Sequence, residues 1–298
     1  MICDNCPRLC ACDRESGKLG FCGMPHEIYV AKHLIHPYEE PCLSCRGGAG
    51  TIFFSSCNLR CVFCQNKEIS RGNTGKCVSE DELLDIMYSL ADMGAECIEL
   101  VTPTHYLSQL IPVLQKAKQK IKLPFVYNSG GYESASSLKR LDGLIDVYMP
   151  DLKYYSDDLA KKYSNAPNYF NTAIDGIKEM LRQVGNPSFD ENGKLLRGVI
   201  VRHLVLPACR DDSIAALTAL AKEISPDSII LSLMSQYTPD FYDISLGGHK
   251  NLLRRVTSFE YQKVLNTAIE LGFDGYFQGR ESASKAFTPK FDDDTKSF

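Results

Sequence analysis

The sequence lacks the features that would direct it into a membrane or out of the cell. Met1-Ile2-Cys3-Asp4 does not begin a charged and then apolar leader, and no apolar run approaches the roughly 18 residues of a membrane-spanning helix. Internal repeats are also missing, and the formal net charge of −4 comes from interspersed acidic and basic residues without a basic stripe. We therefore expect a soluble cytoplasmic globular protein, with no membrane partner and no indication of a nucleic-acid partner.

Cysteine, by contrast, is abundant. The chain has 13 cysteines, and ten of them lie within the first 64 residues. In a secreted chain this density would indicate disulfides, but a reducing cytosol leaves thiolates free to bind metal. Metal ligation is therefore the leading interpretation of this region, whereas the isolated Cys77, Cys97 and Cys209 are more typical of small buried apolar residues.

Strand and helix patterns alternate from Gly50 onward. Strands are expected at 50–54, 97–102, 124–128, 146–150, 198–206, 228–234 and 274–277, and helices at 79–93, 106–120, 134–141, 169–184, 214–224 and 259–271. Strands separated by helices predict parallel pairing, and hence an α/β fold with a wound sheet or a complete or partial barrel. We expect residues 1–48 to form a Cys-rich metal-binding extension and residues 49–298 to form the α/β domain.

A C-x3-C-x2-C run, Cys57, Cys61 and Cys64, directly follows the first expected strand. Three thiolates can bind three irons of a [4Fe–4S] cluster, and the lack of a nearby fourth cysteine leaves one iron open. An open iron can chelate S-adenosylmethionine (SAM), whose reductive cleavage releases a 5′-deoxyadenosyl radical. A zinc site and a coincidental run are the alternatives, although zinc usually takes four ligands in paired C-x2-C spacings.

This run and its flanks resemble the signature of the radical SAM superfamily, in particular the uncharacterised homologues of the pyruvate formate-lyase activating enzyme. The flanks are Gly50-Thr51-Ile52-Phe53-Phe54-Ser55 and Gln65-Asn66. The resemblance implies a partial (β/α)6-type barrel, a [4Fe–4S] cluster and SAM as cofactors, and an electron donor such as flavodoxin or ferredoxin. It also implies hydrogen abstraction from a protein or peptide substrate, with a glycyl-radical enzyme as an analogy only, and it places Phe63 beside the adenine of SAM.

Polar residues after the second and third expected strands are further candidates for holding SAM. Activases of this kind carry Gly-Gly-Glu after the second strand, whereas this chain has Thr102 and Thr104, whose neutral hydroxyls could accept hydrogen bonds from the SAM ammonium. Asn128 and Ser129, followed by two glycines, resemble the Thr-Asn-Gly stretch of the same enzymes. A simple turn is the alternative interpretation at both places.

Three later segments add charged or amide side chains. Asp151 and Lys153 match the Asp-Leu-Lys of the activases and share a face, so they could hold the ribose and carboxylate of SAM, with a solvated ion pair as the alternative. Arg202 interrupts an apolar strand and either lines the pocket, as the activases suggest, or forms an internal salt bridge, whereas His203 points to the opposite face. Gln236 is either a pocket residue or an ordinary loop residue.

The N-terminal cysteines predict a second metal site. Seven thiols precede the first expected strand, too few for two four-ligand sites, so one site with spare thiols is the economical interpretation. Both a structural zinc ion and an auxiliary iron–sulfur cluster fit the spacing. The pattern resembles an N-terminal element of the same homologues, with Cys12, Cys42 and Cys45 as additions, and it indicates as ligands Cys3, Cys6, Cys10 and Cys22. A non-catalytic iron–sulfur or zinc protein with a binding or electron-transfer role is the alternative function.

Overall fold

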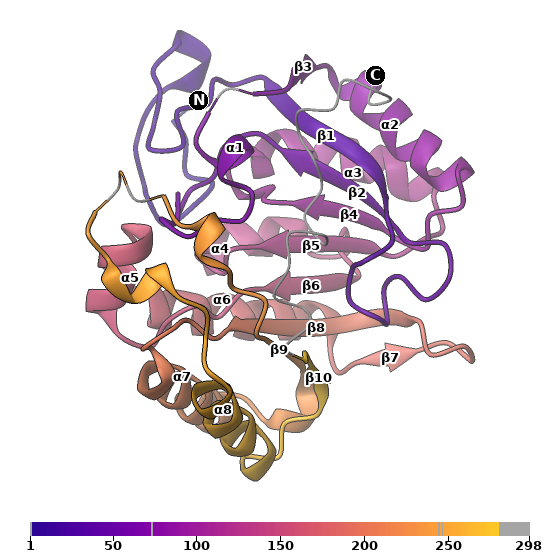
Figure 1. Ribbon diagram of the computed structural model, residues 1–298. Helices are drawn as coiled ribbons and strands as arrows, with labels where there is room; N and C mark the ends of the chain where they lie inside the picture. Colours follow the sequence, from indigo (N-terminus) through magenta and orange to yellow (C-terminus); the bar gives the residue numbers. More distant parts are fainter. Residues whose placement is uncertain (1, 73, 244, 246, 280–298) are drawn as a thin grey trace.

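The fold is built on one open sheet in which parallel strands dominate. The computed structural model describes residues 2–72, 74–243, 245 and 247–279 (Figure 1). Over these residues the sheet has ten strands in the order β10-β9-β8-β6-β5-β4-β2-β1-β3, with β7 (Ser188–Phe189) paired to β8 off this path. Its parallel strands are β2 (Ala49–Phe54), β4 (Ile98–Val101), β5 (Phe125–Ser129), β6 (Val147–Pro150), β8 (Leu195–Leu204), β9 (Ile230–Met234) and β10 (Gly275–Phe277).

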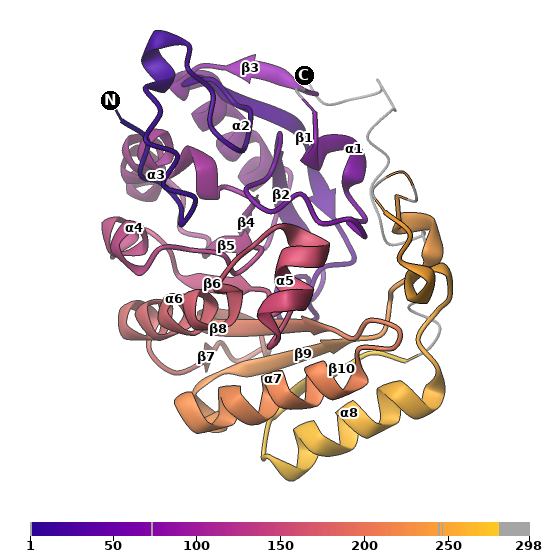
Figure 2. The same cartoon turned by 90° about the vertical axis from the view of Figure 1, so that its left-hand side faces the viewer.

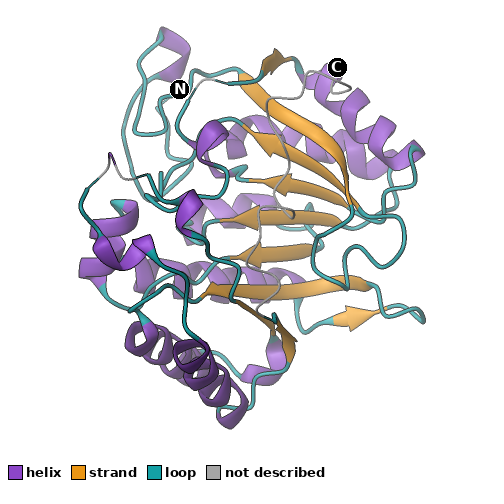
Figure 3. Ribbon diagram, in the orientation of Figure 1, coloured by secondary structure: helices purple, strands orange, loops and turns teal. Residues whose placement is uncertain are grey.

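Helices cover one face of this sheet, which Figure 2 shows from the side. They are α2 (Glu80–Asp92), α3 (Leu107–Lys120), α4 (Ala135–Leu138), α6 (Tyr169–Val184), α7 (Arg210–Glu223) and α8 (Ser258–Glu270). Short helices α1 (Lys67–Ser70) and α5 (Asp157–Ser164) lie near the carboxyl ends of the strands (Figure 3). The expected α/β architecture is confirmed as a partial, open form. No helix of the described residues is long and apolar enough to cross a bilayer.

Local sequence explains why these elements form where they do. At α2, Ser79 Oγ accepts from the backbone N–H of Glu82 at 3.2 Å, and the Glu82 carboxylate accepts from the N–H of Ser79 at 2.8 Å. This is the predicted capping box, and the apolar stripe of the helix, including Met87, is buried against the sheet. Helix α7 begins four residues earlier than predicted because its first turn, with Asp211 and Asp212, has no apolar periodicity but complements the helix dipole.

The N-terminal part of the chain contributes more to the sheet than its sequence predicts. Strand β1 (Ile28–His36) pairs antiparallel with β2, and β3 (Lys76–Val78) pairs antiparallel with β1. The chain then passes under the amino ends of the parallel strands, where buried Cys42 and Leu43 pack in an apolar cluster with Val126 and Met149. This segment therefore forms a floor beneath the sheet, and the domain boundary at residue 48 stays a prediction.

Alternation along β8 separates Arg202 from its neighbour His203. The His203 side chain is buried on the opposite side of the strand, and its Nδ1 lies 2.6 Å from the carbonyl oxygen of Leu152, which accepts the bond. Its Nε2 has no hydrogen-bond partner among the residues that the structure describes. Burial lowers the pKa of His203 from 6.5 to about 4, so the ring is neutral in the folded protein at pH 7.

This histidine makes stability sensitive to mild acid. Between about pH 6.5 and 4 the unfolded chain binds a proton that folded His203 does not, so stability should fall through this interval by about 3 kcal/mol. In His203→Asn an amide nitrogen can still donate to Leu152, but it does not titrate. Urea unfolding at about pH 7 and about pH 4.5 should therefore show a smaller loss in the variant than in the wild type. Equal losses would contradict the assignment.

Candidate functional site

A cavity at the carboxyl ends of the parallel strands collects nearly all of the residues predicted to hold the catalytic cluster and SAM. It is lined by residues from the loop after β2, from the ends of β4, β5, β6, β8 and β9, and from the segment after β1. The predicted residues among them are Cys57, Cys61, Phe63, Cys64, Thr102, Asn128, Ser129, Asp151, Lys153, Arg202 and Gln236. Thr104 is the one predicted SAM contact that does not line it.

The cysteine loop holds its sulfur atoms with hydrogen bonds from neighbouring groups. The backbone N–H of Leu59 donates to Cys57 Sγ at 3.3 Å, and Ser164 Oγ donates to Cys61 Sγ at 2.9 Å. Such bonds orient sulfur ligands and stabilise their charged form. Ser56 and Arg60 have left-handed backbones, with φ of 69° and 58°, so the loop turns tightly around these sulfurs.

Contacts with distant segments fix the same loop in place. The Arg71 guanidinium donates to the carbonyl oxygen of Cys61 at 2.7 Å and forms an ion pair with Asp243 at 2.5 Å. The backbone N–H of Val62 donates to the carbonyl oxygen of Tyr163 at 2.9 Å. The loop is therefore preorganised by the fold.

Phe63 forms an aromatic wall of the cavity. Its ring meets Tyr154, Tyr163 and Tyr237 edge to face, with centroid distances of 6.4, 6.2 and 6.4 Å. Aromatic rings prefer this geometry, and it holds Phe63 in one orientation. A flat base could pack against such a wall.

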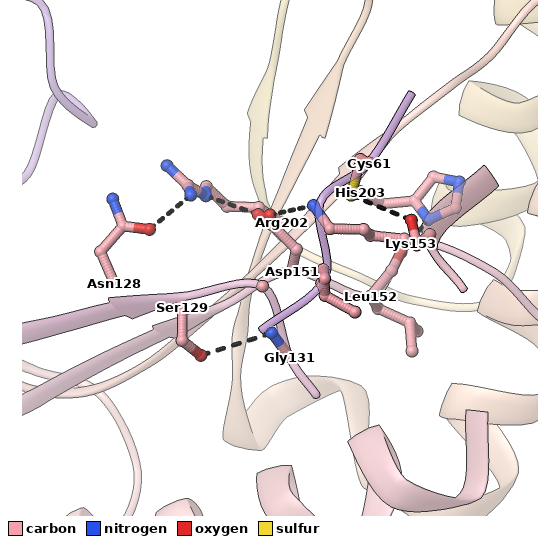
Figure 4. Close-up of polar contacts among 12 residues, drawn as sticks. Cys61, Asn128, Ser129, Gly131, Asp151, Leu152, Lys153, Arg202 and His203 are labelled. Carbon is pink, nitrogen blue, oxygen red and sulfur yellow. Dashed lines mark hydrogen bonds and ion pairs between the residues drawn. The ribbon is translucent and has the colours of Figure 1, made fainter. Parts of the chain in front are cut away.

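Charged and amide side chains that also line the cavity form a connected network (Figure 4). Asp151 accepts from Arg202 Nε at 3.0 Å and from Lys153 Nζ at 2.5 Å, and Arg202 Nη2 donates to Asn128 Oδ1 at 2.6 Å. Burial alone would raise the pKa of Asp151, but the charges of Lys153 and Arg202 outweigh it and hold the pKa below its usual value. Arg202 thus meets both expectations, since it lines the cavity and makes an internal salt bridge.

Sequence reasoning missed two acidic residues of this network. Glu99 is fully buried in β4 and accepts from Asn128 Nδ2 and Thr51 Oγ1, both at 2.7 Å. Burial, together with nearby Glu39, raises the pKa of Glu99 well above its usual value. Glu39 lines the cavity 3.8 Å from Arg202. Glu99 could have been recognised as a site residue, because it is a charged residue inside the apolar strand Ile98–Val101. No comparable sequence pattern surrounds Glu39.

The two predicted threonines have different surroundings. Thr102 lines the cavity with a left-handed backbone, φ 59°, and its N–H donates to the carbonyl oxygen of Asn128 at 2.8 Å. Thr104 is buried, and its hydroxyl donates to Glu133 Oε1 at 2.6 Å. Only Thr102 is placed where it could contact a ligand in this cavity.

Gly131 allows the ends of β5 and β6 to approach closely. Its φ is +75°, and a Cβ there would lie 1.9 Å from the carbonyl oxygen of Asp151. Gly143 has nearly the same φ, +78°, with nothing within 4 Å of its Cβ position. Both Ala variants carry left-handed strain of about 1 kcal/mol, but only Gly131→Ala also meets backbone. Urea unfolding should show Gly131→Ala losing about 1–3 kcal/mol more than Gly143→Ala, and equal losses would contradict this tight contact.

A second recess collects N-terminal cysteines. Cys3, Cys6, Cys10 and Cys22, the predicted ligands, line it together with Cys12. Buried Cys42 and exposed Cys45 lie elsewhere. In the described part of the chain no three Cys, His, Asp or Glu side chains are grouped so as to hold a single metal ion. The thiolates of a multi-iron cluster bind different irons, so they do not have to meet at a single ion. Cys57, Cys61 and Cys64 line one cavity, which suits such a cluster.

Comparison with known families agrees with this geometry. The family model described as "Radical SAM superfamily" matches residues 51–191, which include the cysteine loop, Asn128 and the Asp151–Lys153 pair. Residues 51–191, a little under half of the chain, are therefore similar to a radical SAM domain. Members of the radical SAM superfamily are enzymes that use a [4Fe–4S] cluster and SAM.

One relative in sequence and one solved structure of similar fold extend this likeness beyond the matched residues. An uncharacterized protein of Methanocaldococcus jannaschii is 28% identical over 284 residues, which cover 91% of this chain and 75% of the relative. The crystal structure of methylornithine synthase superposes with a TM-score of 0.51 at 14% identity, covering 76% of this chain and 66% of the synthase. The likeness to the synthase is one of fold, and this chain spans about two thirds of its length.

Proposed function

We propose that this protein is an enzyme that reductively cleaves SAM at a [4Fe–4S] cluster bound by Cys57, Cys61 and Cys64. The observation that carries the proposal is the common cavity, in which these three cysteines face an aromatic wall and a buried charged network. The similarity to a radical SAM domain supports the same chemistry. A cluster bound there would supply the electron that divides SAM into methionine and a 5′-deoxyadenosyl radical.

The residues of the cavity fit both cofactors. Three cysteines on one loop suit three irons, and the N–H and O–H groups that already donate to Cys57 and Cys61 would stabilise their thiolates. Lys153 offers an ammonium group for the carboxylate of SAM, and Asp151 offers a carboxylate for ribose hydroxyls. Phe63 offers its ring to the adenine.

The remaining polar residues would position these groups. Arg202 and Asn128 tie Asp151 to the neighbouring strands, so the carboxylate keeps one orientation in a site largely shielded from water. Thr102, Ser129 and Gln236 lie on the same cavity and would complete the polar contacts of SAM. We assign Thr104 no contact with SAM, because its hydroxyl is bonded to Glu133.

A protein or peptide is the proposed substrate, as for an activating enzyme. Over the described residues the sheet ends at β10 and β3 without closing, and an open sheet admits a chain segment more readily than a closed barrel does. A low-potential donor such as flavodoxin or ferredoxin would supply the electron. Mass spectrometry of candidate protein substrates before and after reaction would test this substrate class, because hydrogen abstraction leaves a changed residue or a cleaved chain.

The cleavage reaction separates this enzyme from a non-catalytic iron–sulfur or zinc protein. Anaerobically reconstituted protein with SAM and dithionite should release 5′-deoxyadenosine and methionine. The variant with Cys57, Cys61 and Cys64 all replaced by Ala should leave SAM intact under the same conditions. An intact SAM pool with the loaded wild-type protein would instead support a binding or electron-transfer role.

A further inference from the structure

The five N-terminal cysteines form a site of their own. Cys3, Cys6, Cys10, Cys12 and Cys22 line one recess, apart from the cavity of the proposed active site. All five are free thiols. We propose that this recess binds an auxiliary iron–sulfur cluster, and not a single metal ion, through four thiolates drawn from these five cysteines.

Backbone contacts bring separate pieces of the chain to this recess. Ile2 and Asp13 form an antiparallel bridge, and the N–H of Cys3 donates to the carbonyl oxygen of Cys12 at 2.9 Å. A turn closed by the N–H of Gly23 and the carbonyl oxygen of Gly20, at 2.9 Å, places Cys22. The thiols therefore meet because the backbone folds around them, although they are spread over 20 residues of sequence.

The space around the sulfur atoms is shaped closely. The backbone N–H of Phe21 donates to Cys10 Sγ at 3.2 Å, the kind of bond that orients a sulfur ligand. A Cβ at Gly20 would lie 3.0 Å from Cys10 Sγ and 3.1 Å from Cys12 Sγ. The φ of Gly20 is not in the left-handed region, so the glycine is needed for room beside the thiols and not for its backbone freedom.

Two anchored cations line the same recess. Arg14 is buried and donates to the carbonyl oxygens of Pro25, at 2.8 Å from Nε, and His105. Arg8 donates to the carbonyl oxygen of Asn58 at 2.8 Å. Because both guanidinium groups are bonded to neutral carbonyls, their positive charge is available to offset several thiolates in a low-dielectric site.

The recess is bonded to the loop of the proposed catalytic cluster. The carbonyl oxygen of Cys22 accepts from Ser56 Oγ and, at 2.9 Å, from Arg60 Nη2, which flank Cys57 on either side. Figures 1 and 2 show the N-terminal loop beside the carboxyl ends of the parallel strands. A metal centre here would brace the loop that carries Cys57.

The test uses the full chain with Cys57, Cys61 and Cys64 replaced by Ala, so that the catalytic cluster contributes no metal. One portion is reconstituted with iron and sulfide, and another with zinc. We expect this variant to retain about four irons with sulfide and a visible chromophore. About one zinc ion with no iron–sulfur chromophore, or the absence of both metals, in protein with reduced thiols and unchanged circular dichroism, would overturn the proposal.

Second variants locate the ligands. Cys6→Ala and Cys22→Ala are introduced together into this triple variant. If only one ligand were lost, the fifth thiol of the recess could replace it, but the three thiols left after both substitutions cannot supply four ligands. Metal content should then fall at least tenfold, whereas Cys42→Ala with Cys45→Ala should leave it unchanged. Gly20→Ala should weaken metal binding about tenfold, and Gly248→Ala, with no atom of the described residues within 4 Å of its Cβ position, should not. Equal losses in the two cysteine pairs would overturn the assignment, and failure of SAM cleavage would leave this test unaffected.

Discussion

Replacing Cys61 with Ala should abolish both the catalytic [4Fe–4S] cluster and the cleavage of SAM. Cys61 is buried in the cavity, its sulfur accepts a hydrogen bond from Ser164, and no other cysteine except Cys57 and Cys64 lines the cavity in the described residues. Two thiolates cannot hold three irons of the cluster, so release of 5′-deoxyadenosine should fall to background, a loss of several orders of magnitude. Cys57→Ala and Cys64→Ala should behave in the same way.

Cys77→Ala is the matched control for these variants. Cys77 is exposed on β3 and lines neither cysteine-containing cavity, so its loss should leave cluster content and SAM cleavage unchanged. Iron and sulfide analysis with 5′-deoxyadenosine assays measures both effects. The decisive variant lacks the N-terminal thiols and also has Cys57, Cys61 and Cys64 replaced by Ala. If it kept the chromophore of the catalytic cluster, the assignment of these three cysteines as its ligands would be wrong.

Replacing Asp151 with Asn should destabilise the folded protein by about 3–5 kcal/mol. The side chain keeps its size but loses its charge, and Arg202 and Lys153 then remain in a buried site with their shared carboxylate gone. Glu39 lies 3.8 Å from Arg202 and offsets part of this cost. Urea unfolding of the metal-free protein measures the change in the free energy of unfolding.

Glu223→Gln provides the comparison with an exposed ion pair. Glu223 pairs with Lys178 at 2.6 Å, and both side chains are nearly half exposed, 48% and 45%. Solvent screens such a pair, so its loss should cost no more than about 1 kcal/mol. A loss for Asp151→Asn as small as that for Glu223→Gln would mean that water or a rearranged carboxylate compensates the two cations.

Much of the fold was predictable because its signals are local. Each predicted strand and helix from Gly50 onward is confirmed within a few residues, since apolar periodicity and caps such as Ser79 act over one or two turns. Strand β1 was not predicted, because a half-buried strand is recognised by alternating apolar and polar residues. Lys32 and His33, in the middle of β1, are both polar and both half-buried, so this alternation is missing. The floor formed by Cys42 and Leu43 depends on packing against distant strands, which local patterns do not report.

The candidate site shows the same division between local and distant effects. The cysteine loop, Asp151 and Arg202 were recognisable from motif and position, and the cavity gathers them. Thr102 and Thr104 lie only two residues apart, yet the 3-10 turn Thr104–Tyr106 directs one hydroxyl to Glu133 and away from the cavity. Which SAM atoms these residues contact, and the finer resemblance to the activating enzyme, stay predictions.

The floor beneath the sheet has a practical consequence for dissecting this protein. The family match starts at residue 51, which invites a shortened polypeptide that begins there. Such a truncation would remove β1, together with Cys42 and Leu43, and so uncover the apolar underside of Val126, Val147 and Met149. It would also remove Glu39 from Arg202. Residues 51–298 should therefore aggregate when expressed without the residues that precede them.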